Sequence, residues 1–312
     1  MKKTYLLTGA SGFVGSVLLR KLVKRKENVH IILRETSNVW RIKDILSKVQ
    51  IHYTSLSNIK KLIKLIRKIK FNIIFHLATN GAYSYQKDAN EIINTNILGT
   101  WNLLQACSTI DYELFVNTGS SSEYGFKEYA MRETDILEPT SYYAVTKCAQ
   151  TLLCNHIANQ EDRPIVTIRL FSVYGPFEEP RRFIPTLLKA LYFKEEMNLV
   201  SPDIARDYIY IDDLVGVYLK IEGLKKFKGE FFNIGTGVQS TIKEVVEKAI
   251  KITGKNTRFN WKEMKPRTWD TNNWVADISK ARKLLRWTPK INLEDGLRLT
   301  WEWFKNNKSF YK

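Results

Sequence analysis

The chain has 312 residues, 44% of them hydrophobic and 26% charged, which excludes a disordered or collagen-like chain. The formal net charge of +17 favours anionic partners. Apolar runs stay below about 18 residues, so we expect no transmembrane helix and no signal peptide. Three cysteines and four scattered histidines lack metal-ligand spacing. We therefore expect a cytoplasmic protein with free thiols and no metal site.

The first 170 residues alternate short apolar runs with helical patterns. Strands are predicted at 5–8, 29–33, 71–77, 114–118 and 165–170, and helices at about 13–25, 41–48, 57–69, 90–109 and 143–159. This alternation predicts an α/β domain with a doubly wound parallel sheet over residues 1–172. Residues 173–312 carry shorter, mixed signals and more proline and tryptophan. They predict a smaller α+β region, with some segments returning to the first domain.

Basic residues concentrate between Lys60 and Lys70, in a segment where isoleucine and leucine recur at helical spacing. That spacing places the apolar side chains on one face and the basic ones on the other. We favour a solvated helix face over a binding site for a polyanion. Nucleic acid and membrane are accordingly not predicted as partners.

The first predicted strand runs directly into glycines at positions 9, 12 and 15, and a helix follows. Such glycines permit a tight turn, close approach of the backbone to a pyrophosphate, and close packing of helix on strand. The N-terminus of the helix offers free N–H groups and a positive dipole to the phosphates. The sequence therefore predicts a Rossmann-type dinucleotide site.

The tip of the second predicted strand bears on the choice of dinucleotide. A carboxylate there binds the ribose 2′-hydroxyl of NAD, whereas an arginine accepts the 2′-phosphate of NADP. The strand ends at Leu33-Arg34, and Ser37, Asn38 and Arg41 follow, with Glu35 one residue past the tip. This pattern favours NADP over NAD, although Arg34 could also be a surface residue or stack on adenine.

Tyr143 and Lys147 stand four residues apart in a predicted helix and so share one face. A nearby ammonium favours the phenolate, which lets a tyrosine exchange protons with a sugar hydroxyl or carbonyl. A serine-rich segment, 118–125, follows the predicted strand at 114–118. Its hydroxyls would lie at the carboxyl edge of the sheet, where catalytic groups gather. A surface Tyr/Lys pair and a structural serine turn are the alternatives.

Together these motifs resemble the extended short-chain dehydrogenase/reductases of the nucleotide-sugar epimerase/dehydratase family. The motifs, in order, are TGASGFVG at 8–15, HLA at 76–78, NILGT at 96–100, TGSSSEYG at 118–125, Tyr143 with Lys147, RLFSVYGP at 169–176, RDYIYIDDL at 206–214, NIGTG at 233–237 and WTP at 287–289. The resemblance spans essentially the whole chain. It implies an NAD(P)-dependent enzyme with a nucleoside-diphosphate sugar as substrate, bound mainly by residues 173–312. It also implies a homodimer formed through a four-helix bundle.

The resemblance assigns roles residue by residue. Catalysis falls to Ser120, Tyr143 and Lys147. Cofactor contacts are expected at Gly9, Ser11, Gly12, Phe13, Val14, Gly15, Arg34, Ser37, Asn38, Ser55, Leu56, Leu77, Ala78, Thr79, Asn96, Tyr143, Lys147, Leu170, Phe171 and Val173. Substrate contacts are expected at Gly81, Ser84, Ser120, Ser121, Ser122, Ser172, Arg182, Arg206 and Arg267, with Arg206 and Arg267 on the diphosphate.

Departures from the family pattern narrow the chemistry. Sugar 4,6-dehydratases usually carry an acidic residue two positions before the Tyr-Gly of the serine segment, often in an Asp-Glu pair. Ser121 and Ser122 stand at those positions here, and Glu123 directly precedes Tyr124. Because elimination of water needs a positioned acid and base, dehydration and the related decarboxylation are disfavoured. Ser55-Leu56 replaces the usual aspartate that contacts adenine, and Ser172 replaces a frequent asparagine.

Two oxidoreductase chemistries then remain. A 4-reductase would reduce a nucleoside-diphosphate 4-keto-6-deoxysugar with NAD(P)H, and Arg34 favours it because NADPH is the usual reductant. The alternative is a 4-epimerase, which retains NAD and interconverts two 4-hydroxy epimers. We favour the reductase. A non-catalytic NADP sensor or nucleic-acid-binding regulator is the alternative from another class, and it would leave the Ser120/Tyr143/Lys147 set idle.

Overall fold

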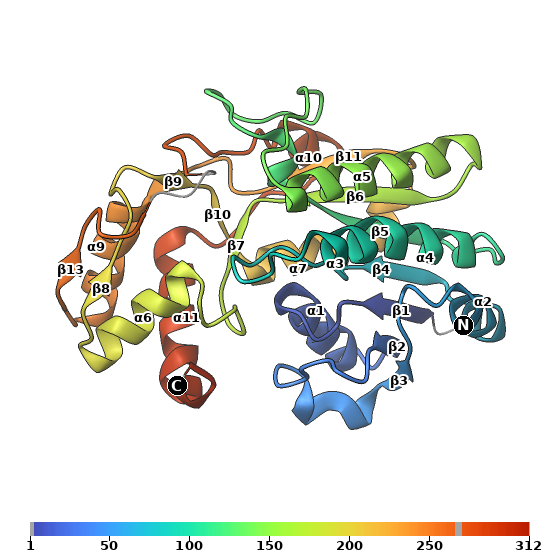
Figure 1. Cartoon of the computed structure of the whole chain (residues 1–312), viewed down its shortest axis with the longest axis horizontal. Helices are drawn as coiled ribbons and strands as arrows, with labels where there is room; N and C mark the ends of the chain where they lie inside the picture. The colour runs from blue at the N-terminus through green and yellow to red at the C-terminus, as the bar shows by residue number, and fades with distance from the viewer. Residues whose placement is uncertain (1–2, 266–269, 312) are drawn as a thin grey trace. The chain divides into compact units, whose positions relative to one another are not determined.

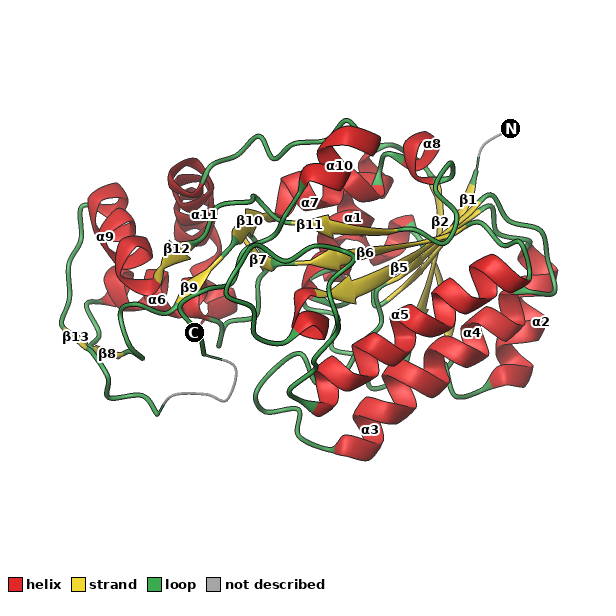
Figure 2. Ribbon diagram, turned by 90° about the horizontal axis from the view of Figure 1, so that it is seen from above, coloured by secondary structure: helices red, strands yellow, loops and turns green. Residues whose placement is uncertain are grey.

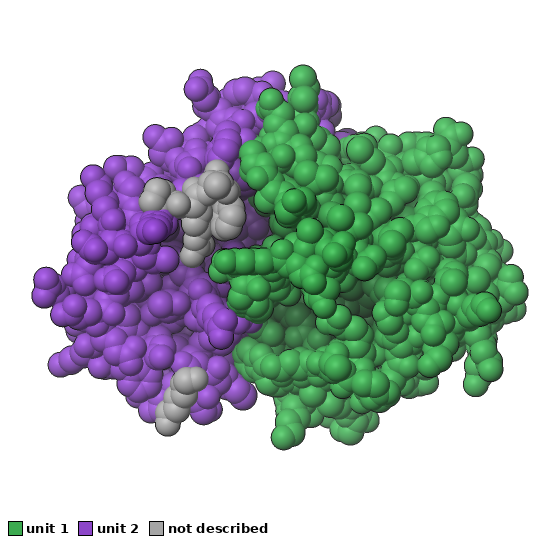
Figure 3. Space-filling view, viewed as in Figure 1, with its two compact units in different colours: residues 1–125, 136–169, 218–232 green, residues 126–135, 170–217, 233–312 purple. Residues whose placement is uncertain are grey.

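The computed structural model describes residues 3–265 and 270–311, which form two compact units. The first unit comprises residues 1–125, 136–169 and 218–232, and the second comprises 126–135, 170–217 and 233–312 (Figure 3). The chain thus leaves the first unit after Arg169, three residues before the boundary expected from the sequence. Segment 218–232 returns to the first unit, and segment 126–135 joins the second.

A seven-stranded sheet in the order β11-β6-β5-β4-β1-β2-β3 organises the first unit. The strands are β1 (Thr4–Thr8), β2 (Asn28–Leu33), β3 (Gln50–Tyr53), β4 (Ile73–His76), β5 (Leu114–Ser120), β6 (Ile165–Leu170) and β11 (Phe231–Ile234). Neighbouring strands pair in parallel from β3 through β2, β1 and β4 to β5. From β1, the chain first adds strands on one side, β2 and β3, and then on the other side, starting with β4. The strand order therefore reverses between β1 and β4. Ligands of doubly wound sheets bind at the carboxyl ends of the strands that flank such a reversal.

Helices cover both faces of this sheet. They are α1 (Phe13–Lys24), α2 (Ile59–Ile69), α3 (Ala89–Ile93), α4 (Gly99–Cys107), α5 (Tyr142–Gln160) and α8 (Ile221–Leu224). Figure 2 shows α2, α4 and α5 on one face and α1 on the other. A π-helical turn, η2 (Asn94–Leu98), joins α3 to α4, and two 3-10 helices, η1 (Lys43–Lys48) and η3 (Ser121–Tyr124), complete the unit.

The predicted doubly wound sheet is confirmed, and its differences from the prediction have local causes. The strands β3 and β11 were missed because both are short, and β3 is exposed or half-buried along its length and so lacks an apolar run. The helix expected at 41–48 is instead the 3-10 helix η1, which buries only Ile45. A single apolar contact cannot support several α-helical turns.

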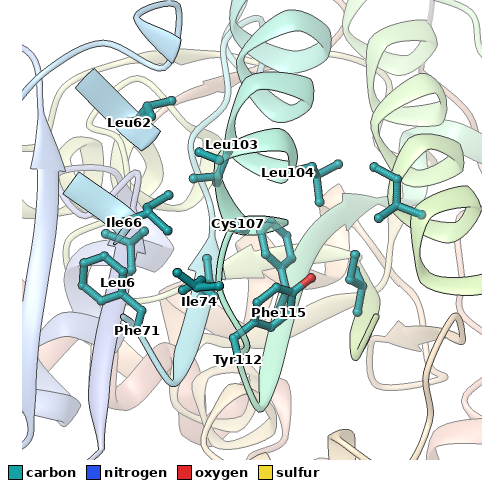
Figure 4. Close-up of a cluster of buried hydrophobic side chains, with 14 of the residues drawn as sticks. Leu6, Leu62, Ile66, Phe71, Ile74, Leu103, Leu104, Cys107, Tyr112 and Phe115 are labelled. Atoms are coloured by element: carbon teal, nitrogen blue, oxygen red, sulfur yellow. The ribbon is translucent and has the colours of Figure 1, made fainter. Parts of the chain in front are cut away.

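The core of the first unit lies between the sheet and the helices α2, α4 and α5. Figure 4 shows side chains such as Leu6, Leu62, Ile74 and Phe115 converging there. Burial of each large apolar side chain contributes about 1.5–3 kcal/mol. In α2 the basic side chains are all exposed, whereas its apolar ones are buried or half-buried. The predicted solvated basic face is therefore confirmed.

The second unit is α+β, as expected from its shorter signals. Its helices are α6 (Phe183–Phe193), α7 (Ile211–Tyr218), α9 (Ile242–Thr253), α10 (Ser279–Leu284), α11 (Leu293–Asn307) and the 3-10 helix η4 (Lys308–Tyr311) (Figure 1). Its short strands are β7 (Ser172–Tyr174), β8 (Met197–Asn198), β9 (Ala205–Arg206), β10 (Tyr208–Tyr210), β12 (Ser240–Thr241) and β13 (Phe259–Asn260). They pair as β10 with β7, β12 with β9 and β13 with β8. Among the described helices, none is long and apolar enough to cross a membrane.

Candidate active site

The turn between β1 and α1 has the geometry of a phosphate cradle. Gly9 adopts a left-handed φ of 70° and lies against the residue that follows β4, since a Cβ there would stand 2.5 Å from the Leu77 carbonyl carbon. A Cβ on Gly15 would stand 2.1 Å from the Gly9 carbonyl oxygen. Both positions therefore require glycine. Gly12 caps α1, and its N–H donates to the Gly9 carbonyl at 3.0 Å. These residues fit a dinucleotide pyrophosphate at the helix N-terminus.

The other predicted cofactor contacts in this turn are Ser11, Phe13 and Val14, which lie beside Gly12 where the turn leads into α1. Phe13 and Val14 begin α1, with Phe13 buried and Val14 half-buried. The Ser11 carbonyl accepts a hydrogen bond from Arg41 Nη1 at 3.4 Å. The turn thus carries a buried guanidinium beside it, because Arg41 is only 6% exposed and stacks on Trp40 at 4.4 Å.

The tip of β2 carries Arg34, whose side chain is exposed. Its N–H donates to Ser37 Oγ at 2.9 Å, which folds the following segment into a turn. Asn38 is exposed, and its Oδ1 accepts from the Trp40 N–H at 3.2 Å. Two arginines, Arg34 and Arg41, therefore follow β2. A carboxylate at the strand tip would favour NAD, and Arg34 occupies that position instead.

A buried polar network lies under the carboxyl end of β4. His76 is fully buried, and its ring nitrogens lie 2.7 Å from Thr8 Oγ1 and 2.8 Å from Thr100 Oγ1. Because Thr100 donates its proton to the Asn96 carbonyl, it accepts from His76 Nε2. The imidazole is then neutral with a proton on Nε2, and burial lowers the pKa of His76 to about 3. The Ala78 N–H also donates to Thr8 Oγ1, at 3.3 Å.

Asn96 projects from the π-helical turn η2 and joins three segments. Its Oδ1 accepts from Thr79 Oγ1 at 3.1 Å and from the Asn80 N–H at 2.8 Å. Its Nδ2 donates to Thr146 Oγ1 on α5 at 2.9 Å. The structure therefore brings Asn96 and Thr79 together with α5. Asn80 and Thr146 were missed by the sequence reasoning because no motif marks them.

Lys147 is buried on α5, and Tyr143 is half-buried one helical turn earlier. Ser141 caps this helix by accepting from the Ala144 N–H at 3.2 Å. The Lys147 ammonium donates to the Thr118 carbonyl on β5 at 2.5 Å, so its side chain lies beside that strand. Burial lowers the pKa of Lys147 to about 8. Such a lysine can supply positive charge to a tyrosine near neutral pH.

The serine segment forms the carboxyl end of β5 and the turn η3. Ser120 and Ser121 are buried, and Ser122 is half-buried. Ser120 Oγ accepts from the Ser122 N–H at 3.2 Å, within a capping box that also includes Glu123. The helix α5 packs on both β5 and η3. Ser120 and Lys147 are therefore held by adjoining elements of the same unit.

Glu123 is withdrawn from any reaction surface. Its side chain is completely buried and lies 2.8 Å from the Arg169 Nε, and Arg169 Nη1 donates to Tyr124 at 2.8 Å. Glu123 Oε1 also accepts from the Ser120 N–H at 2.8 Å. Burial raises the pKa of Glu123, and the guanidinium and the Ser120 N–H oppose this rise. The carboxylate that the sequence places beside Tyr124 thus anchors the serine segment.

The other predicted contacts of the first unit lie on loops at the same edge of the sheet. Ser55 and Leu56 follow β3 and are half-buried, and the Leu56 carbonyl accepts from Asn102 Nδ2 at 2.9 Å. Gly81 has a left-handed φ of 89°, and its N–H donates to Gln86 Oε1 at 3.0 Å. Ser84 lies three residues further on and is exposed.

The remaining predicted contacts belong to the second unit. Leu170 ends β6, and Phe171, Ser172 and Val173 continue the chain into β7, where the Ser172 N–H donates to the Asp207 carbonyl at 2.9 Å. Arg182 precedes α6, with its Nε 3.6 Å from Glu178 Oε1. Arg267 lies outside the described residues.

Arg206 is held rather than free to move. Its guanidinium lies 3.3 Å from Asp270 Oδ1, donates to the Thr271 carbonyl at 3.1 Å and stacks over Trp274 at 5.4 Å. The neighbouring Asp207 is buried and accepts from the N–H groups of Thr236, Gly237 and Ala276. Asp207 thus fixes the backbone at residues 236–237 and 276, whereas the guanidinium of Arg206 is held by Asp270, Thr271 and Trp274.

Comparisons with known proteins identify the class. Residues 6–300 match the family described as GDP-mannose 4,6 dehydratase. An uncharacterised UDP-glucose epimerase of Bacillus subtilis is 31% identical, covering 94% of this chain and 95% of its own length. A UDP-glucuronate 4-epimerase of Thermodesulfobacterium geofontis is 29% identical, with coverage of 99% and 98%. The structure of a UDP-glucuronic acid 4-epimerase from Bacillus cereus, in complex with UDP-glucuronic acid and NAD, superposes with a TM-score of 0.86 at 30% identity, covering 97% and 99%.

The chain is therefore an extended short-chain dehydrogenase/reductase, and within that class it belongs to the family described as GDP-mannose 4,6 dehydratase. It is an enzyme of the NAD-dependent nucleotide-sugar epimerases, dehydratases and decarboxylases. The resemblance stated from the sequence motifs is confirmed.

Proposed function

We propose that this protein is a 4-epimerase of a UDP-sugar that works with retained NAD. The observation that carries the proposal is the buried Lys147, held against β5 one helical turn from Tyr143, in a chain that aligns end to end with UDP-sugar 4-epimerases. This reverses the order of preference drawn from the sequence, because the comparisons support the 4-epimerase better than the 4-reductase.

The chemistry assigned to the side chains is proton transfer at one oxygen of the sugar. Tyr143 takes the proton from the C4 hydroxyl and returns it to the same oxygen after the 4-ketosugar has turned its opposite face toward the cofactor site. Lys147 stabilises the phenolate with its charge. Ser120 donates a hydrogen bond to the reacting oxygen. The turn that carries Gly9, Gly12 and Gly15 would hold NAD, which would supply the acceptor and donor of the C4 hydride.

The fate of Glu123 supports epimerisation over elimination. Loss of water across C5 and C6 requires a carboxylate that reaches the sugar. Glu123 is completely buried and bonded to Arg169, Ser120 and Thr151, so it is not available for such a role. Ser121 and Ser122 supply hydroxyl groups instead, which can orient a sugar but cannot abstract a carbon-bound proton at neutral pH.

The first experiment combines the state of the cofactor with turnover. The purified protein is denatured, the released dinucleotide is identified by absorbance and mass, and UDP-glucose and UDP-glucuronic acid are each incubated with native protein. We expect retained NAD, no net change in absorbance at 340 nm and conversion of one UDP-sugar to its 4-epimer. The Tyr143→Phe variant should lose turnover by a factor of at least about 100 while binding both ligands, because general acid–base catalysis contributes about 10²–10⁴-fold.

A 4-reductase that uses NADPH is the second candidate. Arg34 and the buried Arg41 beyond β2 favour it, because guanidinium groups suit a ribose 2′-phosphate. Stoichiometric consumption of NADPH with a 4-keto-6-deoxy nucleotide sugar, by protein purified without dinucleotide, would establish this candidate and reject the epimerase.

A homodimer built from α4 and α5 is also proposed. The two helices pack together, yet they expose large apolar side chains at Leu98, Trp101, Val145 and Leu152, where Leu98 ends η2 just before α4. Pairing two copies would cover this face in a four-helix arrangement. Sedimentation of Leu152→Glu should show a monomer where the unmodified protein is a dimer. A dimer that survives this change would place the interface elsewhere.

A further inference from the structure

A relay of buried amides and hydroxyls ends on the Lys147 ammonium. Lys147 Nζ donates to Gln150 Oε1 at 2.5 Å, in addition to its bond to the Thr118 carbonyl. Gln150 Nε2 donates to Asn117 Oδ1 on β5 at 2.7 Å, and Asn117 Nδ2 donates to Thr167 Oγ1 on β6 at 3.1 Å. All of these side chains are buried. The relay therefore connects α5, which carries Tyr143 and Lys147, to β5 and β6 of the sheet.

The relay can adopt only one orientation at Gln150. Turning its amide over would aim an N–H group at the ammonium, which has only donors, and an oxygen at the Asn117 oxygen. Both contacts would be repulsive and buried, at a cost comparable to leaving buried polar groups unpaired. The glutamine carbonyl oxygen thus stays on the lysine, and the bond fixes where the ammonium lies along α5.

The two acceptors of the ammonium, the Thr118 carbonyl and Gln150 Oε1, are neutral. The titratable groups around Lys147 are His76 of β4, Glu123 of η3, and Tyr143 and Cys154 of α5. Of these, His76 is neutral, and Glu123 is bonded to Arg169. Burial lowers the pKa of Lys147 to about 8, and Glu123 opposes that decrease. The protonation of Lys147 is therefore sensitive to what stands at position 150.

We propose that Gln150 is a positioning residue for the reaction, which keeps the Lys147 ammonium both charged and directed toward Tyr143 and the cofactor. An ammonium has three N–H donors, and the relay occupies one while Thr118 occupies another. The third remains for the reaction. A carboxylate at position 150 would hold the lysine as a tight ion pair, whereas an apolar side chain would leave it to lose its proton near neutral pH. The inference rests on the proposed roles of Tyr143 and Lys147.

The test compares Gln150→Leu and Gln150→Glu with the same two changes at Gln160, which is exposed at the end of the same helix. The rate of epimerisation is measured from pH 6 to 10. We expect the alkaline limb of the pH–rate profile to move down by about one pH unit in Gln150→Leu and up by about one in Gln150→Glu. The reason is that a hydrogen bond to a charged group changes that group's pKa by about one unit or more. The Gln160 variants should leave the limb in place.

A direct titration separates this inference from the proposed function. Protein labelled with ¹³C at the lysine ε-carbon is titrated by NMR, with the Lys147 signal assigned by its loss in Lys147→Arg. The same opposite shifts are expected in the two Gln150 variants, whatever substrate the enzyme uses. Failure to turn over UDP-sugars would reject the proposed function alone. An unchanged Lys147 titration in both folded variants would overturn the role of Gln150. If Gln150→Leu does not fold, the upward shift in the isosteric Gln150→Glu decides.

Discussion

Replacing Arg169 by leucine tests whether the serine segment is anchored by a buried ion pair. The side chains of Arg169 and Glu123 are 2% and 0% exposed, and their charged atoms lie 2.8 Å apart. Among the described residues, the Ser120 N–H and the Thr151 hydroxyl are the donors that the substitution would leave for the buried carboxylate. Removing one partner of a buried pair costs about 3–5 kcal/mol, so we expect the free energy of unfolding to fall by that amount at pH 7.

The assay is urea-induced unfolding followed by tryptophan fluorescence. The control is Arg298→Leu, because Arg298 lies 3.4 Å from Glu294 on an exposed helix face, where such a pair contributes less than about 0.5 kcal/mol. The loss in Arg169→Leu should be smaller at pH 4, since a protonated carboxyl costs less to bury. Adding Glu123→Gln should recover part of it, because the amide oxygen still accepts from Ser120. A loss no larger than that of the control would refute the reasoning.

Three further predictions concern the glycine turn, the tip of β2 and the buried His76. Gly15→Ala should abolish dinucleotide binding in a fluorescence titration, because its Cβ would meet the Gly9 carbonyl oxygen at 2.1 Å, whereas Gly216→Ala, which meets nothing within 4 Å, should bind normally. Arg34→Asp should weaken NADPH far more than NADH, and equal losses would remove Arg34 from contact with the 2′-phosphate. In the folded protein His76 is neutral, because burial lowers its pKa to about 3. As pH falls from about 6.5 to 3, the unfolded chain binds a proton at His76 that the folded protein does not. The free energy of unfolding therefore declines over that range, by about 1.4 kcal/mol for each unit by which the two pKa values differ. His76→Gln should flatten this decline in acid denaturation, and an unchanged acid limb would contradict it.

Local patterns in the sequence were sufficient for five of the seven strands of the sheet and for the phosphate turn. Buried parallel strands have no polar face, so their apolar runs are visible without any tertiary information. The glycines at 9 and 15 are required by backbone contacts close to them in the chain or in the next strand of the sheet. The spacing of Tyr143 and Lys147 is also local, because a helical turn alone places them on one face.

The tertiary structure decided the role of Glu123 and the surroundings of Lys147. In sequence Glu123 is a carboxylate beside Tyr124, and only the fold brings Arg169 from β6 to bury and bind it. Gln150 and Asn117 carry no motif. Gln150 lies on α5 three residues after Lys147, and Asn117 bonds to it only because α5 packs on β5. Composition and spacing determine which elements form, since these depend on neighbours along the chain. Buried polar partners such as Arg169 for Glu123 and Asn117 for Gln150 come from segments far apart in sequence, and they meet only once the sheet has assembled.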